Sequence, residues 1–335
     1  MRVVVTGAAG FLGRQLAATL LQRGMFAGRP ITRLVLVDRV GQVGTLTPGA
    51  HVEVLRGDLT DHLDGVFAQP VDVVFHLAAA VSAECESDFD LGMRVNVDAT
   101  RALVDAARTQ SAAGGPVPRL VFTSSLAVYG STPAVPLPPL VSESTLPQPQ
   151  SSYGAQKLIC EQLISDCTRR GDLDGRIARL MTVTVRPGAP NAAASGFASS
   201  IIREPLAGLP ATCPVRPDLH LAISSPRRTV QSILRFAEAE RGTGPGQLNG
   251  PAPVNLPALT VSVADMLTTL RHIAGHAADL VTITPDPAVE AIVTSWPHAF
   301  DNQRATALGL QADPDFLTVV QDHLADQQAA GVLHV

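Results

Sequence analysis

Short runs of apolar, β-branched residues alternate along the first half of the chain with segments whose apolar residues recur every three or four positions. The runs predict strands at residues 3–5, 34–37, 52–55, 72–75 and 119–122. Helical spacing follows the first run through Leu16 and Leu20, and it returns after Asn96 and after Ser151. Strands that are apolar throughout and alternate with helices predict an α/β fold, in which a doubly wound parallel sheet is covered on both faces.

The first predicted strand runs into a glycine-rich turn, TGAAGFLG at residues 6–13, which opens the first predicted helix. Gly7, Gly10 and Gly13 would let a pyrophosphate approach the backbone at a helix N-terminus. A tight turn without a ligand is the alternative interpretation. The position of the motif, after a strand and before a helix, favours dinucleotide binding and therefore a Rossmann-type sheet.

Asp38 stands at the end of the second predicted strand, where a carboxylate lies beside the adenosine ribose in a dinucleotide fold. Such a carboxylate accepts hydrogen bonds from the ribose hydroxyls and repels a 2′-phosphate, so it favours NAD over NADP. The alternatives are a solvated turn residue, or an NADP site served by the adjacent Arg39. His76 ends the fourth strand between apolar residues, which indicates a hydrogen-bonded core histidine rather than a base or ligand.

Composition narrows the class of protein. The chain has 335 residues, 46% of them hydrophobic, and a net charge of -5 with no basic run, so we expect no nucleic-acid partner. No apolar run is long enough to span a membrane, and the strand at the first residues leaves no room for a signal peptide. The four cysteines form no C-x-x-C pair, so we expect reduced thiols, no metal site and a cytoplasmic location.

The second half of the chain has a different and less regular sequence pattern. A proline-rich loop covers residues 133–149, a strand is predicted at 177–185, and Ser225 and Ser262 resemble helix N-caps. Pro297 and Pro314 are expected to divide the tail into short helices. We therefore expect an NAD-binding Rossmann domain at residues 1–178. Residues 179–335 are expected to form mainly a smaller substrate-binding lid, with some segments returning to the Rossmann sheet.

Ser125, Tyr153 and Lys157 form one candidate catalytic constellation. Tyr153 and Lys157 are four residues apart and share one face of a predicted helix, while Ser125 follows the fifth strand. A phenol has a pKa near 10, and an ammonium one turn away would lower that pKa. The tyrosinate would then take an alcohol proton while the carbinol hydrogen leaves as hydride to the cofactor, with the serine hydroxyl bonded to the reacting oxygen.

With these motifs in place, the sequence resembles the extended short-chain dehydrogenases/reductases, the NAD-dependent epimerase/dehydratase family. The resemblance implies NAD as the cofactor and no metal; a homodimer is also expected. The residues expected to contact NAD are Gly7, Gly10, Phe11, Leu12, Gly13, Asp38, Asp58, Leu59, Leu77, Ala78, Ala79, Asn96, Ser124, Tyr153, Lys157, Thr182 and Val183.

Segments outside the shared core, at residues 84–90, 186–191, 195–206, 225–228 and 295–297, resemble one branch of this family. Members of that branch use NAD to oxidise C2 of a four-carbon sugar acid. A substrate carboxylate needs arginine or clustered neutral donors, and Arg186, Arg203, Arg227 and Arg228 are the candidate arginines. The residues expected to contact the substrate are Ser82, Ser125, Tyr153, Asn191, Ser195 and Arg228. The leading carboxylate anchor is the Ser195 region together with Arg228, with Ser82 as a hydroxyl partner.

Two other functions remain open at this point. A nucleotide-sugar epimerase would use the same serine, tyrosine and lysine, and a non-catalytic NAD-binding scaffold would usually have lost the tyrosine or the lysine. A dehydratase is disfavoured, because Leu126 and Ala127 stand after Ser125 where an acid and a base are needed.

Overall fold

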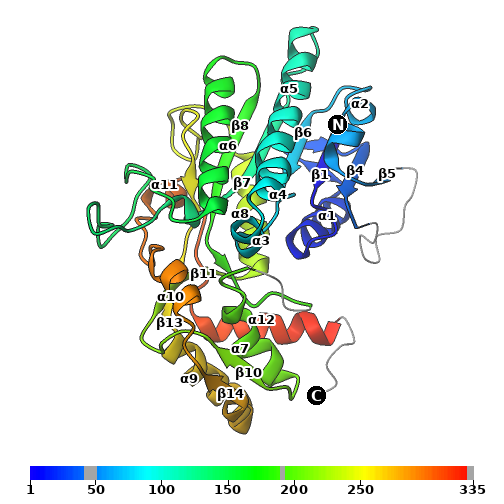
Figure 1. The fold of residues 1–335 in the computed structure, drawn as a ribbon. Helices are drawn as coiled ribbons and strands as arrows, with labels where there is room; N and C mark the ends of the chain where they lie inside the picture. Colours follow the sequence, from blue (N-terminus) through cyan, green and yellow to red (C-terminus); the bar gives the residue numbers. More distant parts are fainter. Residues whose placement is uncertain (41–50, 189–192, 330–335) are drawn as a thin grey trace.

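The computed structural model describes residues 1–40, 51–188 and 193–329, and its centre is a seven-stranded sheet (Figure 1). Every neighbouring pair in this sheet is parallel, in the order β12-β8-β7-β6-β1-β4-β5. The strands are β1 (Arg2–Thr6), β4 (Arg33–Asp38), β5 (Val52–Arg56), β6 (Val73–His76), β7 (Arg119–Ser125), β8 (Asp174–Leu180) and β12 (Val254–Asn255). This topology confirms the predicted doubly wound fold.

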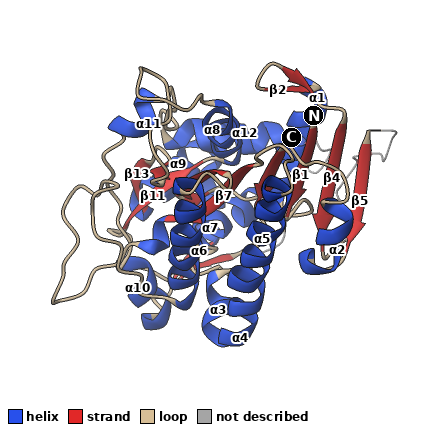
Figure 2. Cartoon of the chain, turned by 90° about the horizontal axis from the view of Figure 1, so that it is seen from above, coloured by secondary structure: helices blue, strands red, loops and turns tan. Residues whose placement is uncertain are grey.

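Helices cover both faces of the sheet, as Figure 2 shows. Side chains alternate along each strand, so Val3 and Val5 of β1 pack in one core cluster and Val4 packs in another. The first face is covered by α1 (Phe11–Arg23) and α8 (Pro226–Glu238), and the second by α2 (Leu59–Val66), α5 (Ala99–Ala112) and α6 (Ser152–Arg169). Apolar residues on both faces of each strand explain why the strands read as unbroken hydrophobic runs.

Short elements connect these layers: the hairpin lies near the amino end of β1, and the other elements follow the carboxyl ends of β6 and β7. They are the hairpin β2 (Met25–Phe26) and β3 (Arg29–Pro30), α3 (Ser82–Ser87), α4 (Phe89–Gly92), the π-helix η1 (Met93–Asp98) and the 3₁₀ turn η2 (Leu126–Val128). The helix predicted from Asn96 therefore begins earlier than expected, because α4 and η1 run into α5 without a break.

A second, smaller unit, which we call the lid, lies below the main sheet in Figure 1. It contains the sheets β13-β11-β9 and β10-β14 and has its own hydrophobic core. Its strands are β9 (Thr182–Val183), β10 (Ala211–Cys213), β11 (His220–Ser224), β13 (Leu259–Ser262) and β14 (Val281–Ile283). Its helices are α7 (Phe197–Leu206), α9 (Val263–Ala274), the 3₁₀ segment η3 (Gly275–Leu280), α10 (Pro287–Thr294) and α12 (Phe316–Ala329).

Three local predictions in the second half can be compared with the structure. The strand predicted at residues 177–185 is wrong as one element, because the chain leaves the main sheet after Leu180 and joins the lid sheet at β9. The tail is divided by prolines as expected into α10, α11 (Gln303–Ala307) and α12, but α12 is not short, at 14 residues. Both predicted N-caps are present: Ser225 Oγ accepts from Arg228 N (3.1 Å) and Ser262 Oγ from Asp265 N (3.0 Å).

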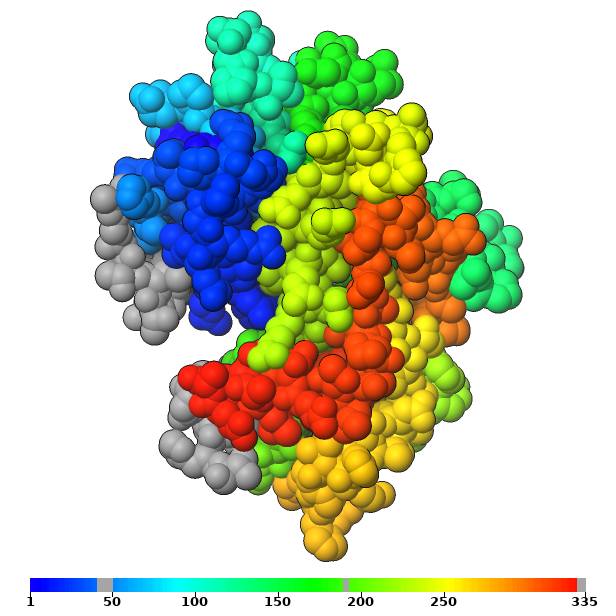
Figure 3. All heavy atoms as spheres, turned by 180° about the vertical axis from the view of Figure 1, so that it is seen from behind, coloured from blue at the N-terminus to red at the C-terminus, as the bar shows by residue number. Residues whose placement is uncertain are grey.

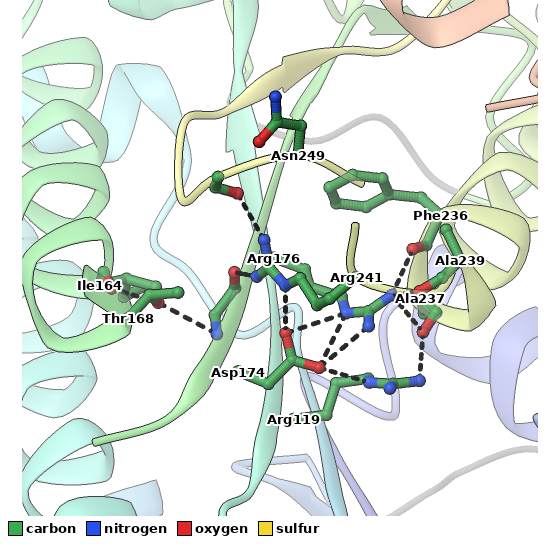
Figure 4. Close-up of polar contacts among 12 residues, drawn as sticks. Arg119, Ile164, Thr168, Asp174, Arg176, Phe236, Ala237, Ala239, Arg241 and Asn249 are labelled. Carbon is green, nitrogen blue, oxygen red and sulfur yellow. Dashed lines mark hydrogen bonds and ion pairs between the residues drawn. The ribbon is translucent and has the colours of Figure 1, made fainter. Parts of the chain in front are cut away.

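A cluster of three arginines around Asp174 ties the C-terminal end of α8 to the main sheet (Figure 4). Arg119, Arg176 and Arg241 lie 2.8, 2.9 and 2.7 Å from the Asp174 carboxylate. Arg119 and Arg176 also donate to the carbonyl oxygen of Ala237, at 2.8 and 2.9 Å. Positive charge at a helix C-terminus is favourable, so this cluster holds α8 in place through the helix dipole as well as through hydrogen bonds.

Within residues 1–40, 51–188 and 193–329, no helix has the length and apolar character needed to cross a membrane. All four cysteines fall in these ranges, and each is buried and unpaired.

Candidate active site

A cavity of about 310 Å³ opens where the carboxyl ends of β1, β6 and β7 meet the first residues of the lid. Most of the residues predicted from the sequence line it. These are Gly7, Gly10, Phe11, Leu12, Gly13, Leu77, Ala79, Ser82, Ser124, Ser125, Tyr153, Lys157, Thr182, Val183 and Ser195. The structure therefore brings residues from both halves of the chain to one place. Asn191 lies outside the described residues.

The glycine turn packs so closely that side chains would not fit at two positions. A Cβ atom at Gly13 would lie 2.1 Å from the carbonyl oxygen of Gly7, and one at Gly7, where φ is +69°, would lie 2.6 Å from the backbone nitrogen of Ala78. In α1, which the structure describes in full, no acidic residue occupies the first turn, and the N-cap residue, Gly10, has no side chain that could bond the first N–H groups. The first backbone N–H groups of α1 are thus left for an anion, which fits the pyrophosphate of a dinucleotide.

Asp38 lies beside this turn at the end of β4. Its Oδ2 accepts a hydrogen bond from Ala9 N (2.9 Å) and its Oδ1 accepts one from Val40 N (3.0 Å). Arg39 turns to Asp58, with 3.2 Å between Nε and Oδ1, and both of these side chains are more than 60% exposed. The Asp38 carboxylate is therefore held at the glycine turn, while Arg39 pairs with a different acid.

Four further predicted cofactor residues, Asp58, Leu59, Ala78 and Asn96, are not among the described residues that line the cavity. Leu59, after Asp58 at the start of α2, is buried in the core under the sheet. Ala78 does not line the cavity in the described structure; its N–H lies 3.3 Å from Thr6 Oγ1. Their predicted contacts with NAD are therefore not visible in the cavity itself.

Asn96 also lies behind the cavity, in η1. Its Oδ1 accepts from Ala80 N (2.8 Å), and its Nδ2 donates to Ala80 O (3.2 Å) and to Gln156 Oε1 (2.8 Å). The extra residue per turn of a π-helix is a common device at functional sites. Here Asn96 supports the loop that follows β6.

His76 is the core histidine that the sequence predicts. The ring is 1% exposed, with Nδ1 2.6 Å from Thr6 Oγ1 and Nε2 2.9 Å from Thr100 Oγ1. Burial, together with the nearby charge of Lys157, lowers the pKa of His76 to about 3. The neutral ring links β1, β6 and α5 rather than facing the cavity.

Tyr153 and Lys157 lie on the first turns of α6, which Ser151 caps by accepting from Gly154 N (3.2 Å). Lys157 is 2% exposed, and its Nζ donates to the carbonyl oxygen of Thr123 (3.0 Å) at the end of β7. The ammonium lies 5.6 Å from the centre of the Tyr153 ring. Ser125, at the end of β7, shares a hydrogen bond with the Tyr153 hydroxyl.

Burial shifts the pKa values of both groups toward their neutral forms. Burial raises the pKa of Tyr153 to about 12, and Cys85 adds to this, while Arg186 and the hydrogen bond from Ser125 lower it. Burial lowers the pKa of Lys157 to about 8, against the effects of Cys160, Cys85 and Glu161. Lys157 was expected to lower the pKa of Tyr153; in the structure Arg186 is the cation that does so.

Among the described residues, Arg186 is the arginine that lines the cavity. Its Nε donates to Val183 O (2.8 Å), its Nη2 donates to Ser195 Oγ (3.0 Å), and the guanidinium lies 5.8 Å from the centre of the Phe11 ring. Ser82 lies on the same wall and accepts from the backbone nitrogen of Ala194 (3.0 Å). A cation, two hydroxyls and Tyr153 therefore surround one small volume.

The choice of Arg228 as the leading anchor is not supported, because Arg228 is not among the described residues that line the cavity. It follows the N-cap of α8, and its Nη1 donates to Gln231 Oε1 on the same helix (3.3 Å). Arg227 pairs with Asp322 and Asp326 of α12, and Arg203 donates to Arg186 O (2.8 Å).

Several cavity residues, Met181 and Trp296 among them, were not assigned individual roles from the sequence. Met181 lies at the junction between β8 and β9, and Trp296 follows α10. The segment 295–297 did stand out as a motif outside the shared core, which is the signal that marked Trp296. It is the single tryptophan of the chain, so its fluorescence reports on this cavity.

The sequence and the fold of this chain are both similar to those of known proteins. Residues 3–218 match the NAD dependent epimerase/dehydratase family. The chain is 49% identical to D-erythronate dehydrogenase of Cupriavidus necator over 97% of its length and 98% of the relative, and 38% identical to D-erythronate dehydrogenase of Haemophilus influenzae over 97% and 99%. The crystal structure of the nucleoside-diphosphate-sugar epimerase from Agrobacterium tumefaciens is similar, with a TM-score of 0.90 and 37% identity over 99% of this chain and 96% of that chain.

Proposed function

Because the chain belongs to the NAD dependent epimerase/dehydratase family, we propose that it oxidises the C2 hydroxyl of a sugar acid, D-erythronate, to the 2-oxo acid with NAD. The observation that carries this proposal is a serine, tyrosine and lysine set facing one arginine in a small cavity. The similarity to two dehydrogenases of that name over nearly the whole chain supports the choice of substrate.

The chain's own residues divide the binding of NAD between them. The N–H groups at the start of α1 would hold the pyrophosphate, and Asp38 would accept from the adenosine ribose. Lys157 would hold the nicotinamide ribose, with Thr182 and Val183 beside the nicotinamide amide. When bound, NAD supplies the acceptor for the hydride.

Tyr153 acts as the base in this proposal. In the free protein its pKa is about 12, so the phenol is protonated at neutral pH. The positive charge of Arg186 and the hydrogen bond with Ser125 favour the phenolate. Tyr153 takes the proton from the C2 hydroxyl, while Ser125 donates to the same oxygen and orients it.

Arg186 anchors the substrate carboxylate. A guanidinium binds a carboxylate through two parallel charge-assisted hydrogen bonds, which fixes orientation as well as position. Val183 O and Ser195 Oγ hold the guanidinium in place, and Ser82 offers a hydroxyl to the substrate. This arrangement would turn the C2 hydrogen toward the nicotinamide side of the cavity.

The test is a panel assay with NAD on D-erythronate, L-threonate, a five-carbon aldonate and UDP-galactose. We expect NADH formation with D-erythronate and the weakest response with the nucleotide sugar. Interconversion of UDP-galactose without turnover of any acid would refute the proposal in favour of an epimerase. Binding of NAD without turnover of any of the four would favour a non-catalytic scaffold.

We also propose that residues 1–178 bind NAD, that residues 179–335 mainly bind the substrate, and that the protein works in the cytoplasm as a homodimer. Buried, unpaired cysteines support a reducing compartment. The participation of α8 and β12 in the larger layers supports a domain division in which later segments return to the main sheet. Light scattering coupled to gel filtration tests the dimer.

A further inference from the structure

Glu161 lies one helical turn after Lys157 and two turns after Tyr153, so these three side chains project from one side of α6 toward the ends of the strands. Its side chain is fully buried, yet it is not among the described residues that line the cavity. A buried carboxylate is costly unless it is paired, so its partners show what it does.

The partners of Glu161 are the ends of two neighbouring strands. Its Oε1 accepts from Ser124 Oγ (2.5 Å) and from Arg179 Nε (2.9 Å), and its Oε2 accepts from Arg179 Nη2 (2.6 Å). Ser124 and Arg179 are direct neighbours in the ladder between β7 and β8. Glu161 therefore bridges both strands from the helix that carries Tyr153 and Lys157.

The ion pair is itself supported from the edge of the sheet. Arg179 is 2% exposed, and its Nη1 donates to the hydroxyl of Tyr129 (2.5 Å), which lies 3.1 Å from Asn255 Oδ1 on β12. Burial disfavours the charge on Arg179, but Glu161 outweighs it and raises the pKa of Arg179. The pair is thus a fixed, ionised element behind the cavity.

Ser124 connects this element to the reacting groups. The residue before it, Thr123, supplies the carbonyl oxygen that accepts from Lys157 Nζ, and the residue after it is Ser125. A bond that holds Ser124 therefore holds the strand end that carries both contacts. We propose that Glu161, fixed by Arg179, is a positioning residue that holds this strand end through Ser124 and supplies negative charge one helical turn from Lys157.

The charge has a definite effect on Lys157. The other titratable groups near Lys157 are Cys85 from α3, His76 from β6, and Tyr153 and Cys160 on α6 itself. Burial lowers the pKa of Lys157, and Cys160, Cys85 and Glu161 oppose it; of these three, Glu161 is the acid paired with a fixed cation. Removing its charge disfavours the ammonium, so the pKa of Lys157 falls below about 8.

This inference rests on the dehydrogenase function proposed above, and it predicts two separable effects. Glu161→Gln keeps the shape of the side chain and removes its charge. We expect the inflection of the kcat/KM profile that reports the ionisation of Lys157, near pH 8 in the wild type, to move to lower pH by about one unit. Ser124→Ala keeps every charge and removes the tether, so we expect kcat to fall about tenfold with no movement of this inflection.

Glu161→Gln leaves the buried Arg179 unpaired, so the double variant E161Q/R179M serves where the single variant does not fold. Replacing a buried ion pair with neutral side chains is often tolerated. Arg179 is not among the groups that shift the pKa of Lys157, so the double variant should also move the Lys157 inflection of the kcat/KM profile to lower pH. Asp166→Asn is the matched control, because Asp166 is an exposed acid on the same helix.

Profiles of kcat/KM from pH 6 to 10 decide the matter, measured on whichever substrate the wild-type protein turns over. Failure of the dehydrogenase proposal would appear in the wild-type panel, whereas failure of this inference would appear only in the variants. If the Lys157 inflection of the kcat/KM profile stays at the wild-type pH in E161Q and E161Q/R179M, even at a reduced rate, the role of Glu161 is purely structural and the proposed effect of its charge is refuted. If Ser124→Ala has the kcat of the wild type, the proposal that Ser124 holds this strand end for catalysis is refuted.

Discussion

Replacing Arg186 tests both the assigned carboxylate anchor and the protonation of Tyr153. Arg186→Met keeps most of the length of the side chain and removes the guanidinium that bonds Val183 O and Ser195 Oγ. Arg228→Met is the matched control, because it makes the same chemical change on α8, where the guanidinium bonds Gln231 rather than lining the cavity. We expect a large loss of activity on the acid in the first variant and little change in the second.

The size of the loss follows from the bonds that disappear. A hydrogen bond to a charged group contributes about 1.5–3 kcal/mol, so losing the pairing with the substrate carboxylate should lower kcat/KM by about 10- to 150-fold. A second effect acts on Tyr153. The charge of Arg186 lowers the pKa of Tyr153, so its removal raises that pKa and leaves less phenolate at every pH in the assay.

The assay measures kcat/KM for D-erythronate between pH 6 and 10, with NAD affinity measured separately from the fluorescence of Trp296. Arg186→Lys keeps a cation without the planar fork, so it should retain part of the activity and little of the precise orientation. Thermal melts check that each variant is folded. The reasoning is refuted if Arg186→Met stays within twofold of the wild type, or if Arg228→Met loses as much activity.

Three further outcomes are expected. Tyr153→Phe should keep NAD affinity and lower kcat by about 10² to 10⁴-fold in steady-state assays, since it removes the base. Asp38 should make kcat/KM higher with NAD than with NADP, and Asp38→Ser should narrow that ratio. Burial opposes ionisation of Asp174, but Arg176 and Arg241 outweigh it and hold the pKa of Asp174 at about 2. This pKa is below the unfolded value near 3.9, so ionised Asp174 stabilises the folded state by about 2.6 kcal/mol. The stabilisation is complete above about pH 5 and is lost as the pH falls through 2. Urea unfolding of Asp174→Asn should therefore show the largest loss in the free energy of unfolding at neutral pH and a small loss near pH 2.

The main sheet was predictable because its pattern is strong and local. Each strand is a short apolar run, and the side chains that alternate between two cores, such as Val3 and Val4, are all apolar. The glycine turn was predictable for a related reason, since close backbone contact excludes other residues at Gly7 and Gly13. Polar residues that follow the strands, such as Asp38 and Ser125, then meet at the edge that the topology creates.

The carboxylate anchor was not predictable in the same way. Four arginines occur in the lid motifs, and nothing in their spacing distinguishes the one that turns toward the main sheet. Arg227 is drawn to acids on α12, which lies about a hundred residues later in the chain. Arg186 reaches the cavity only because the strand predicted at residues 177–185 breaks after Leu180 and crosses to the lid. Long-range pairing decided both cases.

The contrast between the predictable main sheet and the less predictable lid also affects the choice between a dehydrogenase and an epimerase. Relatives of both names match nearly the whole chain, and either chemistry would use Ser125, Tyr153 and Lys157, so the fold and the reacting set do not separate them. The difference must come from the lid side of the cavity. Among the described residues that line the cavity, Arg186 supplies the one guanidinium, and Trp296 lines the same cavity. One guanidinium suits the single carboxylate of a short acid, whereas a nucleotide sugar brings a diphosphate and a base that need further cations and more room.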